Sequence, residues 1–474
     1  MYLKNLLINS EQITDLSLAI AVIESQEVRL NHQEKHIAKL EERISYLEKN
    51  SGNSSKPPSS DIVKPPSEQR QKGKRHAGGQ SRHKGNYRLP YLPEEVDRVV
   101  EPELLHCPVC SGAVILSSEN AARIIQQAEL VSKPVEFTEY RLNSYYCPKC
   151  NRYHRAGLPV GVDERSICGV RLQSCISYLK GSSCISYNEL RLFLREVFCF
   201  KISTGGLSNL VNRVSESLLP AYNELGIAIR NEPLLHIDET GWKDNGFRHW
   251  VWLCCNDNLA YFHISDSRGA KVLQELLGDN FSGAVVSDFY SAYVKLGNIK
   301  QQFCLAHLIR DIKFLTTLPC VKTKAFGDKL LIHFANIFKI WHRKNEVPID
   351  ELKIMLNRRV TRLRNFLSRD KDREDHIHKM KKRFNKHWSS LFRFVQEPEI
   401  YEPTNNLAEQ TLRIATRIRY LTQGTRSGWG QHWWSRILSV IGTCKKKKIS
   451  AYRFINDAIN AKITGEIYPV LLQT

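Results

Sequence analysis

Two apolar stretches of the chain each end on a carboxylate. "LLHID" ends on Asp238, after which a Thr-Gly pair breaks the strand pattern, and "GAVVSD" ends on Asp288. Short apolar runs of this kind predict buried strands, and the two carboxylates lie side by side if the strands are neighbours. Two carboxylates so close together repel each other, and each raises the pKa of the other. Mg²⁺ (or Mn²⁺) removes the conflict because it prefers oxygen ligands, and two such ions can clamp an in-line phosphoryl displacement.

A third acid is expected from the segment "PTNNLAEQTLRIATR". Its Pro-Thr-Asn run is a helix start, and Glu409 sits one turn in. Arg413 and Arg417 follow at four-residue steps, on the same helix face. We therefore expect Glu409 to reach the metals while Arg413 and Arg417 face phosphates.

Two further acids follow Asp238. Successive strand residues point to opposite faces, so only one of Asp238 and Glu239 is expected at the metals. The other would turn into the following loop, as a cap. Asp244 is expected in that loop, without an assigned task.

Four cysteines form two C-x2-C knuckles, each with proline behind its first cysteine: Cys107, Cys110, Cys147 and Cys150. Two knuckles can bring four thiolates to one tetrahedral Zn²⁺. We predict a structural zinc site; a redox dithiol pair is the rival interpretation.

The sequence "CLAH" places Cys304 and His307 shortly after Asp288. The pair could be half of a metal site, but no second half is evident. A buried, hydrogen-bonded histidine is equally consistent with the pattern. We expect Cys304 and His307 to support the active site.

These residues need a mixed α+β fold to position them. Strand patterns at 249–256 and 259–265 and a helix pattern at 269–278 separate the two carboxylate strands. The predicted catalytic domain spans 231–445, with a basic helical insertion at about 310–400 that could clamp DNA or serve only as a scaffold. A helical tail follows at 446–474.

The N-terminal half predicts four smaller parts. Residues 10–50 carry a heptad pattern that favours a dimeric coiled coil over a single packed helix. Residues 51–90 form a basic flexible linker, in which Lys72, Lys74 and Arg75 would lie along phosphates. A zinc-binding domain occupies 91–160. Residues 161–230 are helical, with a helix-turn-helix or a simple packing pair as alternatives.

The bulk composition indicates a polyanionic partner. The chain of 474 residues has a formal net charge of +20, which favours nucleic acid. Its 13 cysteines are an odd number in a long chain and suggest reduced thiols and metal ligands. No apolar run reaches the roughly 18–20 residues of a membrane span, so we expect a cytoplasmic, nucleoid-associated protein of a bacterial-type cell.

A family resemblance accompanies these motifs. "HIDETGW", "RHWVWL", "SRGAKVLQELLG", "GAVVSDFYSAY", "FCLAHLIRDI" and "PTNNLAEQTLR" occur in this order, and the chain resembles the insertion-sequence-66 family of transposases. The resemblance implies a ribonuclease-H-like catalytic domain of the DDE type, with Asp238, Asp288 and Glu409 as the metal-binding triad.

The resemblance also implies a function. A DDE transposase cuts double-stranded DNA at the terminal inverted repeats of its element and joins the ends to target DNA. It would act as a dimer or higher oligomer, and accessory proteins can take part. The alternatives are an inactive or domesticated DNA-binding protein of the same fold, or a metal-dependent nuclease that does not join strands.

Overall fold

The computed structural model describes residues 16–50, 52–53, 91–102, 104–106, 108–113, 124–131, 133–297, 299–369 and 374–472. Cys107, Lys72, Lys74 and Arg75 fall outside these residues, as does most of the predicted linker. Two compact units contain the chain: a large one (1–65, 140–195 and 201–474) and a small one (66–139 and 196–200). The protein is a mixed α+β, multidomain chain. Within the described residues, no helix combines the length and the apolar character that a membrane crossing requires.

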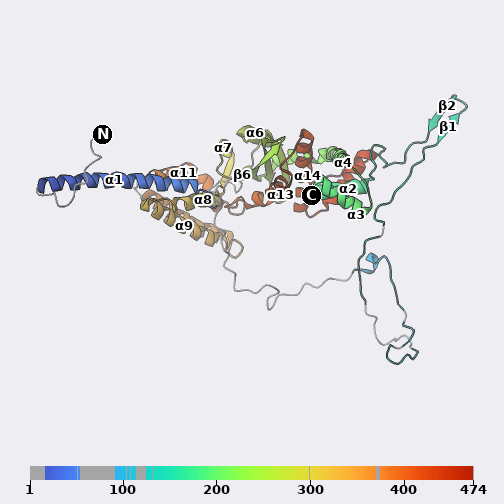
Figure 1. The fold of residues 1–474 in the computed structure, drawn as a ribbon, viewed down its shortest axis with the longest axis horizontal. Coiled ribbons are helices and arrows are strands. Elements are labelled where there is room, and N and C mark those ends of the chain that lie inside the picture. Colours follow the sequence, from blue (N-terminus) through green and yellow to red (C-terminus); the bar gives the residue numbers. More distant parts are fainter. Residues whose placement is uncertain are drawn as a thin grey trace. The chain divides into compact units, whose positions relative to one another are not determined.

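The large unit is built around a five-stranded sheet, whose strand β6 is labelled in Figure 1. The strand order is β5-β4-β3-β6-β7. β3, β4 and β5 form an antiparallel meander, whereas β6 and β7 run parallel to β3. The strands are β3 (Leu234–Asp244), β4 (Phe247–Cys255), β5 (Ala260–Ser265), β6 (Ala284–Ser287) and β7 (Lys300–Phe303). The carboxylate strands β3 and β6 are therefore neighbours.

β3 is longer than its sequence pattern predicts. It continues through Thr240 and Gly241 to Asp244, and it pairs with β4 from His236 to Asp244. The turn at Asn245 and Gly246 has positive φ at both residues (49° and 84°), which suits a tight two-residue hairpin. Asp238 consequently lies within a strand and not at its end, and Asp244 lies in the strand and not in a loop.

β7 has no counterpart in the sequence patterns. It is only four residues long, and its two glutamines are buried. Gln301 donates to the Tyr293 carbonyl (2.8 Å), and Gln302 donates to the Leu391 carbonyl (3.0 Å). Polar side chains bonded to main-chain carbonyls replace the apolar signal that would have revealed this strand.

The outer edge of β5 is covered by helix α14 (Gly428–Lys446). The Phe262 amide donates to the Ser439 hydroxyl (2.8 Å), and the Ala260 amide donates to the Thr443 hydroxyl (3.1 Å). The spacing matches because four helical residues rise about 6 Å and two strand residues about 6.6 Å. α14 thus satisfies the outward-facing amides of an edge strand.

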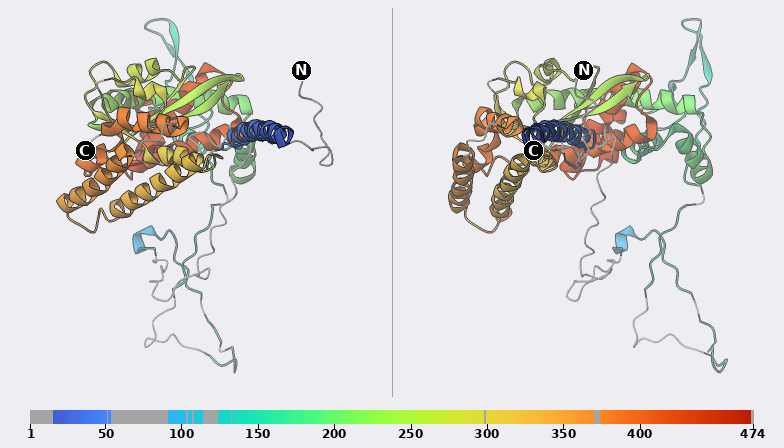
Figure 2. Two further views of the ribbon diagram at one scale, coloured as in Figure 1. Left: turned by 90° about the vertical axis from the view of Figure 1, so that its left-hand side faces the viewer. Right: turned by 60° about the vertical axis from the view of Figure 1, so that its left-hand side comes forward.

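Further helices lie before and after β6 in the chain, and others follow β7. They are α6 (Ala270–Leu277), α7 (Ser291–Val294), α8 (Leu305–Leu315), α9 (Val321–Trp341), α10 (Ile349–Arg369), α11 (Asp375–Leu391), α12 (Arg393–Gln396) and α13 (Asn406–Thr422). Figure 2 shows α9 and α10, in yellow to orange, side by side as an antiparallel hairpin. Phe334 of α9 stacks on Phe384 of α11, so this helical layer has its own apolar core.

A second helical group precedes the sheet. It comprises α2 (Val170–Ser183), α3 (Tyr187–Phe198), α4 (Thr204–Ser217), α5 (Leu219–Ala228) and the short 3-10 turn η4 (Ile229–Asn231). The C-terminal helix α15 (Ala451–Thr464) packs against α2 and α4. Ser203 caps α4 by accepting from the Gly206 amide (3.0 Å), as a serine at this place predicts.

The N-terminal helix α1 (Leu16–Leu47) leaves its apolar seam exposed, including Ile23, Leu30 and Ile37. Its C-terminal end packs on the rest of the large unit, where Tyr46 lies edge-on against Phe314 of α8 (ring centroids 5.2 Å apart). The remaining described elements are the 3-10 turn η3 (Pro93–Glu95) and the hairpin of β1 (Ser144–Cys147) and β2 (Arg152–Arg155).

Candidate active site

Asp238 and Asp288 follow the paired part of two parallel strands. The last paired residues are His236 of β3 and Val286 of β6, and each aspartate lies two residues beyond its member of this pair. Both carboxylates accept a nearby main-chain amide: Asp238 from Glu239 (2.9 Å) and Asp288 from Tyr290 (2.8 Å). The parallel register therefore brings the two acids to the same level of the sheet.

The two aspartates are electrostatically strained. Burial raises the pKa of Asp238 well above its usual range, and the charges of Glu239, Asp288 and Glu409 raise it further. Burial and the charge of Glu239 raise the pKa of Asp288 to about 6, against smaller opposing effects of the Tyr290 amide and nearby arginines. Half-buried carboxylates with mutual repulsion are the environment that a divalent cation would relieve.

Glu239 has a different fate from its neighbour. It is buried, its Oε1 lies 2.6 Å from Nη2 of Arg268, and the Tyr293 hydroxyl donates to its Oε2. The Arg268 guanidinium lies over the rings of Trp250 (4.6 Å) and Tyr290 (3.8 Å). The expectation that Glu239 caps a following loop was wrong, because β3 continues and directs this side chain to an internal cation.

Glu409 is brought to the aspartates by the start of α13. Asn405, only 1% exposed, donates from its Nδ2 to the Ile237 carbonyl of β3 (2.8 Å). Its Oδ1 lies 3.0 Å from Nδ1 of His236, and its main-chain amide donates to Sγ of Cys304 (3.2 Å). The Asn405 carbonyl then accepts the Glu409 amide (3.1 Å) in the first helical turn. Asn405 thus fastens the helix to the strand that carries Asp238.

The importance of Asn405 was not apparent in the sequence. An asparagine before a helix is ordinarily read as a cap, yet its side chain bonds to β3 and not to its own helix. Only the partner strand, 168 residues earlier, reveals its task.

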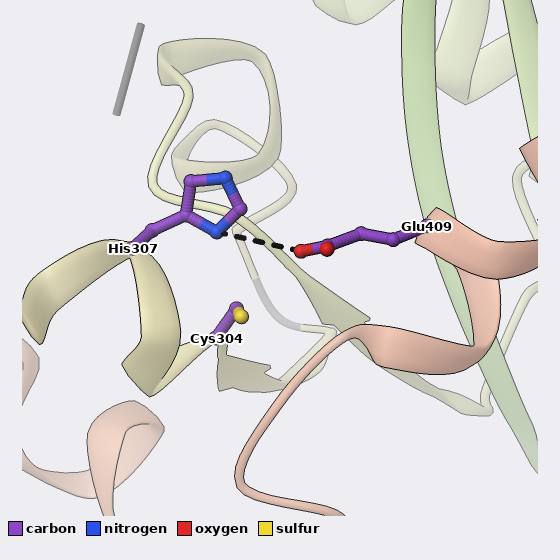
Figure 3. Close-up of side chains that lie close together, drawn as sticks. All are labelled: Cys304, His307 and Glu409. Carbon is purple, nitrogen blue, oxygen red and sulfur yellow. Dashed lines mark ion pairs between the residues drawn. The ribbon is translucent and has the colours of Figure 1, made fainter. Parts of the chain in front are cut away.

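Cys304 and His307 lie beside Glu409 (Figure 3). The Cys304 Sγ, a ring nitrogen of His307 and a Glu409 carboxylate oxygen all lie within 4.8 Å of one another, and His307 Nδ1 lies 3.9 Å from Glu409 Oε1. Burial lowers the pKa of His307 to about 4, helped by the charge of Arg310. Burial raises the pKa of the Cys304 thiol to about 11. The structure thus brings this sequence-predicted pair to the third acid of the proposed triad.

The two α13 arginines that the sequence singled out have unequal surroundings. Both are exposed, but Arg417 donates to the Ser182 carbonyl of α2 (3.0 Å). Arg419 was not singled out in the sequence, and it donates to the Gly241 carbonyl (2.6 Å) and to Thr240 (3.0 Å). Arg413 is therefore the α13 arginine with the more open side chain for a phosphate.

The described cysteines of the predicted zinc site belong to different units. Cys147 and Cys150 lie at the β1–β2 hairpin in the large unit, and Cys110 belongs to the small unit. Hydrogen bonds from the Cys150 amide and thiol, with a smaller one from the Lys149 amide, lower the pKa of Cys147. Cys150 Sγ lies 3.4 Å from Nε2 of His154. A thiol whose thiolate is favoured in this way has the chemistry of a zinc ligand.

A basic cavity of about 420 Å³ lies at the junction of α3 and α4. Its lining consists of Arg191, Arg195, Lys201, Ile202 and Ser203. Farther along α4, Asn209 is exposed, but Arg213 contacts Ser166 (3.4 Å) within the unit. The open, charged part of the helix pair is therefore its turn.

Comparison with known proteins gives two family matches and one relative. Residues 165–432, more than half of the chain, match the family model described as "Transposase IS66 family". Residues 10–89 match a family of unknown function, DUF6444. An uncharacterized protein, y4jD of Sinorhizobium fredii (strain NBRC 101917 / NGR234), is 22% identical over 417 residues, covering 80% of this chain and 79% of that protein.

Proposed function

Because the chain belongs to the IS66 family of transposases, we propose that it is a metal-dependent DDE transposase with Asp238, Asp288 and Glu409 as its acidic triad. The observation that carries the proposal is the meeting of three chain segments: β3, the end of β6, and the first turn of α13. The sheet order, three antiparallel strands followed by two parallel ones, also supports a ribonuclease-H-like core.

The residues at this place suit Mg²⁺ or Mn²⁺. All three side chains offer hard oxygen donors, and the raised pKa values of Asp238 and Asp288 reflect their burial and, next, the repulsion of neighbouring acids, both of which a divalent cation offsets. When bound, a pair of such ions activates the attacking oxygen and stabilises the leaving oxygen of a phosphodiester.

The chain itself orients these groups. Asn405 holds α13 against β3, so buried hydrogen bonds fix the start of the helix that carries Glu409 relative to the strand that carries Asp238. The Tyr290 amide orients the Asp288 carboxylate. Arg413 is placed one turn beyond Glu409 on an exposed face, where it can contact a DNA phosphate.

DNA ends would be held by parts outside the acid cluster. The basic cavity of Arg191, Arg195 and Lys201 at the α3–α4 turn suits a backbone phosphate, which supports the helix-turn-helix interpretation over a mere packing pair. Lys72, Lys74 and Arg75 remain predicted phosphate contacts. Zn²⁺ at Cys107, Cys110, Cys147 and Cys150 remains a prediction, with the lowered pKa of Cys147 in its favour.

A dimer would form through α1. Its exposed apolar residues recur along one seam, as two such helices in a coiled coil require. Two protomers would let one assembly hold both inverted repeats of an element. The requirement for accessory proteins is tested by adding the element's other protein products to the marker-movement experiment that follows.

The experiment that tests the proposal places a selectable marker between the DNA flanks of this gene. Movement to a second replicon is scored for the wild type, for Asp288→Asn and for Asp279→Asn, a matched change of an exposed aspartate. We expect Asp288→Asn to lower movement by at least about 10³-fold, the upper range for losing one preorganised electrostatic contact. Asp279→Asn should move the marker as the wild type does.

Three outcomes would contradict the proposal. Equal movement by Asp288→Asn and the wild type removes Asp288 from the chemistry. Binding of the flanks without movement, even with accessory proteins added, favours a DNA-binding protein of the same fold. Cleaved flanks that never join target DNA identify a nuclease.

A further inference from the structure

We infer that Cys304, His307 and Glu409 form a binding site for a thiophilic divalent cation of the zinc class, and that this cation inhibits the transposase by holding Glu409 (Figure 3). Only the inhibitory effect rests on the proposed function, because that function gives Glu409 its role in catalysis. The sequence offered half of such a site, and the structure supplies the third ligand 102 residues beyond His307.

The three donor atoms are nearly at ligand spacing. Zinc bonds of about 2.0–2.3 Å in a tetrahedral site put neighbouring donors about 3.3–3.8 Å apart. Here the three atoms lie within 4.8 Å of one another, and His307 Nδ1 lies 3.9 Å from Glu409 Oε1. A closure of about 1 Å is within reach of the Glu409 side chain, which is 31% exposed and so has rotational freedom.

The other two ligands are held firmly. The Cys304 amide donates to the Ser287 carbonyl (2.8 Å), directly before Asp288, and Cys304 is the N-cap residue of α8. His307 comes three residues later, on the same face of the first turn. Both side chains are therefore presented by a helix start that is fixed to the strand carrying the second acid.

The donor set selects the metal. One sulfur, one imidazole nitrogen and one carboxylate oxygen suit Zn²⁺, Co²⁺ or Cd²⁺, whereas Mg²⁺ prefers oxygen alone. The buried thiol gives up its proton to solvent when the metal binds.

The site would act as a brake. Glu409 lies in the first turn of α13, and Asn405 fastens the start of that helix to the Ile237 carbonyl of β3, directly before Asp238. A carboxylate drawn toward Cys304 and His307 is withdrawn from Asp238 and Asp288. Zinc bound here should therefore oppose Mg²⁺-dependent cleavage, and a chelator specific for zinc should restore it.

The test measures binding first. The full-length wild type, Cys304→Ser and Cys320→Ser are titrated with Zn²⁺, and with Co²⁺ while the sulfur-to-cobalt absorption is followed. Cys320 is the matched control because it is likewise an N-cap cysteine, that of α9, with nearly the same backbone angles. The wild type and Cys320→Ser should each bind one cation more than Cys304→Ser, whose affinity at this site should fall by more than about 100-fold.

His307→Gln is the second variant, in case Cys304→Ser does not fold. It should lose the same cation while it keeps a polar side chain of similar length. Equal stoichiometry and affinity in the wild type and in a folded Cys304→Ser or His307→Gln protein would overturn the site.

Inhibition is measured on each protein relative to its own zinc-free rate. Zinc should inhibit the wild type and Cys320→Ser and should have at least about tenfold less effect on Cys304→Ser. Inhibition that is the same in all three proteins refutes the brake. If none of the proteins cleaves DNA even without zinc, while the extra cation still binds, the result counts against the proposed transposase and leaves the metal site in place.

Discussion

Asp238 and Glu239 are consecutive residues of β3, yet their carboxylates lie in opposite electrostatic surroundings. Asp238 lies among other acids, whereas Glu239 is paired with a cation of the protein. The Asp238 carboxylate shares its surroundings with Asp288 and Glu409, and its pKa is raised well above the ordinary value. Glu239 is buried against Arg268 and Tyr293. A carboxylate paired inside the protein stabilises the fold, whereas repelling carboxylates are retained at the expense of stability, which points to function.

The largest effect should separate the two acids in catalysis. We expect Asp238→Asn to lower strand transfer by at least about 10³-fold, because it removes one charged ligand of the proposed metals. Glu239→Gln should act mainly through folding, so folded protein should retain far more activity. Strand transfer by the purified, folded fraction of each variant is the measurement. Equal losses in both would place Glu239 at the metals as well.

Stability should change in opposite directions in the two regions. Asp288→Asn removes a carboxylate whose pKa is raised to about 6, and we expect a gain of the order of 1–3 kcal/mol at neutral pH without metal. Glu239→Gln leaves Arg268 without its charge partner and should lose about 1–3 kcal/mol. Urea unfolding in the presence of a chelator measures both. A loss for Asp288→Asn would contradict the repulsion inferred at this site.

The pH dependence should sharpen the same contrast. Folding raises the pKa of Asp288 from 3.8 to about 6, so the folded protein binds the extra proton in this window. Its contribution to stability is present at low pH and is lost as pH rises from about 3.8 through about 6. The difference in unfolding free energy between the wild type and Asp288→Asn should therefore widen over this range. Mg²⁺ should reduce this free-energy difference again above pH 6. If Mg²⁺ leaves the difference unchanged, metal binding by Asp288 is excluded.

The smallest effect concerns Arg268, the cation that is paired with Glu239. Arg268→Lys keeps the charge but loses the flat contact with Trp250 and Tyr290, so we expect a loss of about 1 kcal/mol. Arg248→Lys, at an exposed arginine of β4, is the matched control and should be neutral. Chemical denaturation compares the two, and an unchanged Arg268→Lys protein would mean that charge alone holds Glu239.

The local patterns predicted much of the sheet and less of its surroundings. Apolar runs identified the strands that became β3, β4, β5 and β6, whereas the adjacency of β3 and β6 was only a condition at the sequence level and is seen in the structure. The end of β3 was misplaced because a Thr-Gly pair is a local breaker, whereas nine consecutive residue pairs with β4 overrule it. β7 was missed because its signal consists of two buried glutamines.

The candidate site was predictable where a residue type carries the chemistry. Asp238, Asp288 and Glu409 were selected by their positions in motifs and by the resemblance. Long-range partners were not visible: Arg268 for Glu239, Ile237 for Asn405, and Glu409 for the Cys304–His307 pair. Each of these contacts joins segments that no local periodicity relates.

The cover that α14 places over β5 has a consequence for protein synthesis. Phe262 leaves the ribosome 177 residues before Ser439, the hydroxyl that will accept its amide. Until then the edge of β5 offers open amides to the strands of other nascent chains. We expect products truncated before α14 to aggregate and to be degraded, so that incomplete chains do not accumulate beside the full-length protein.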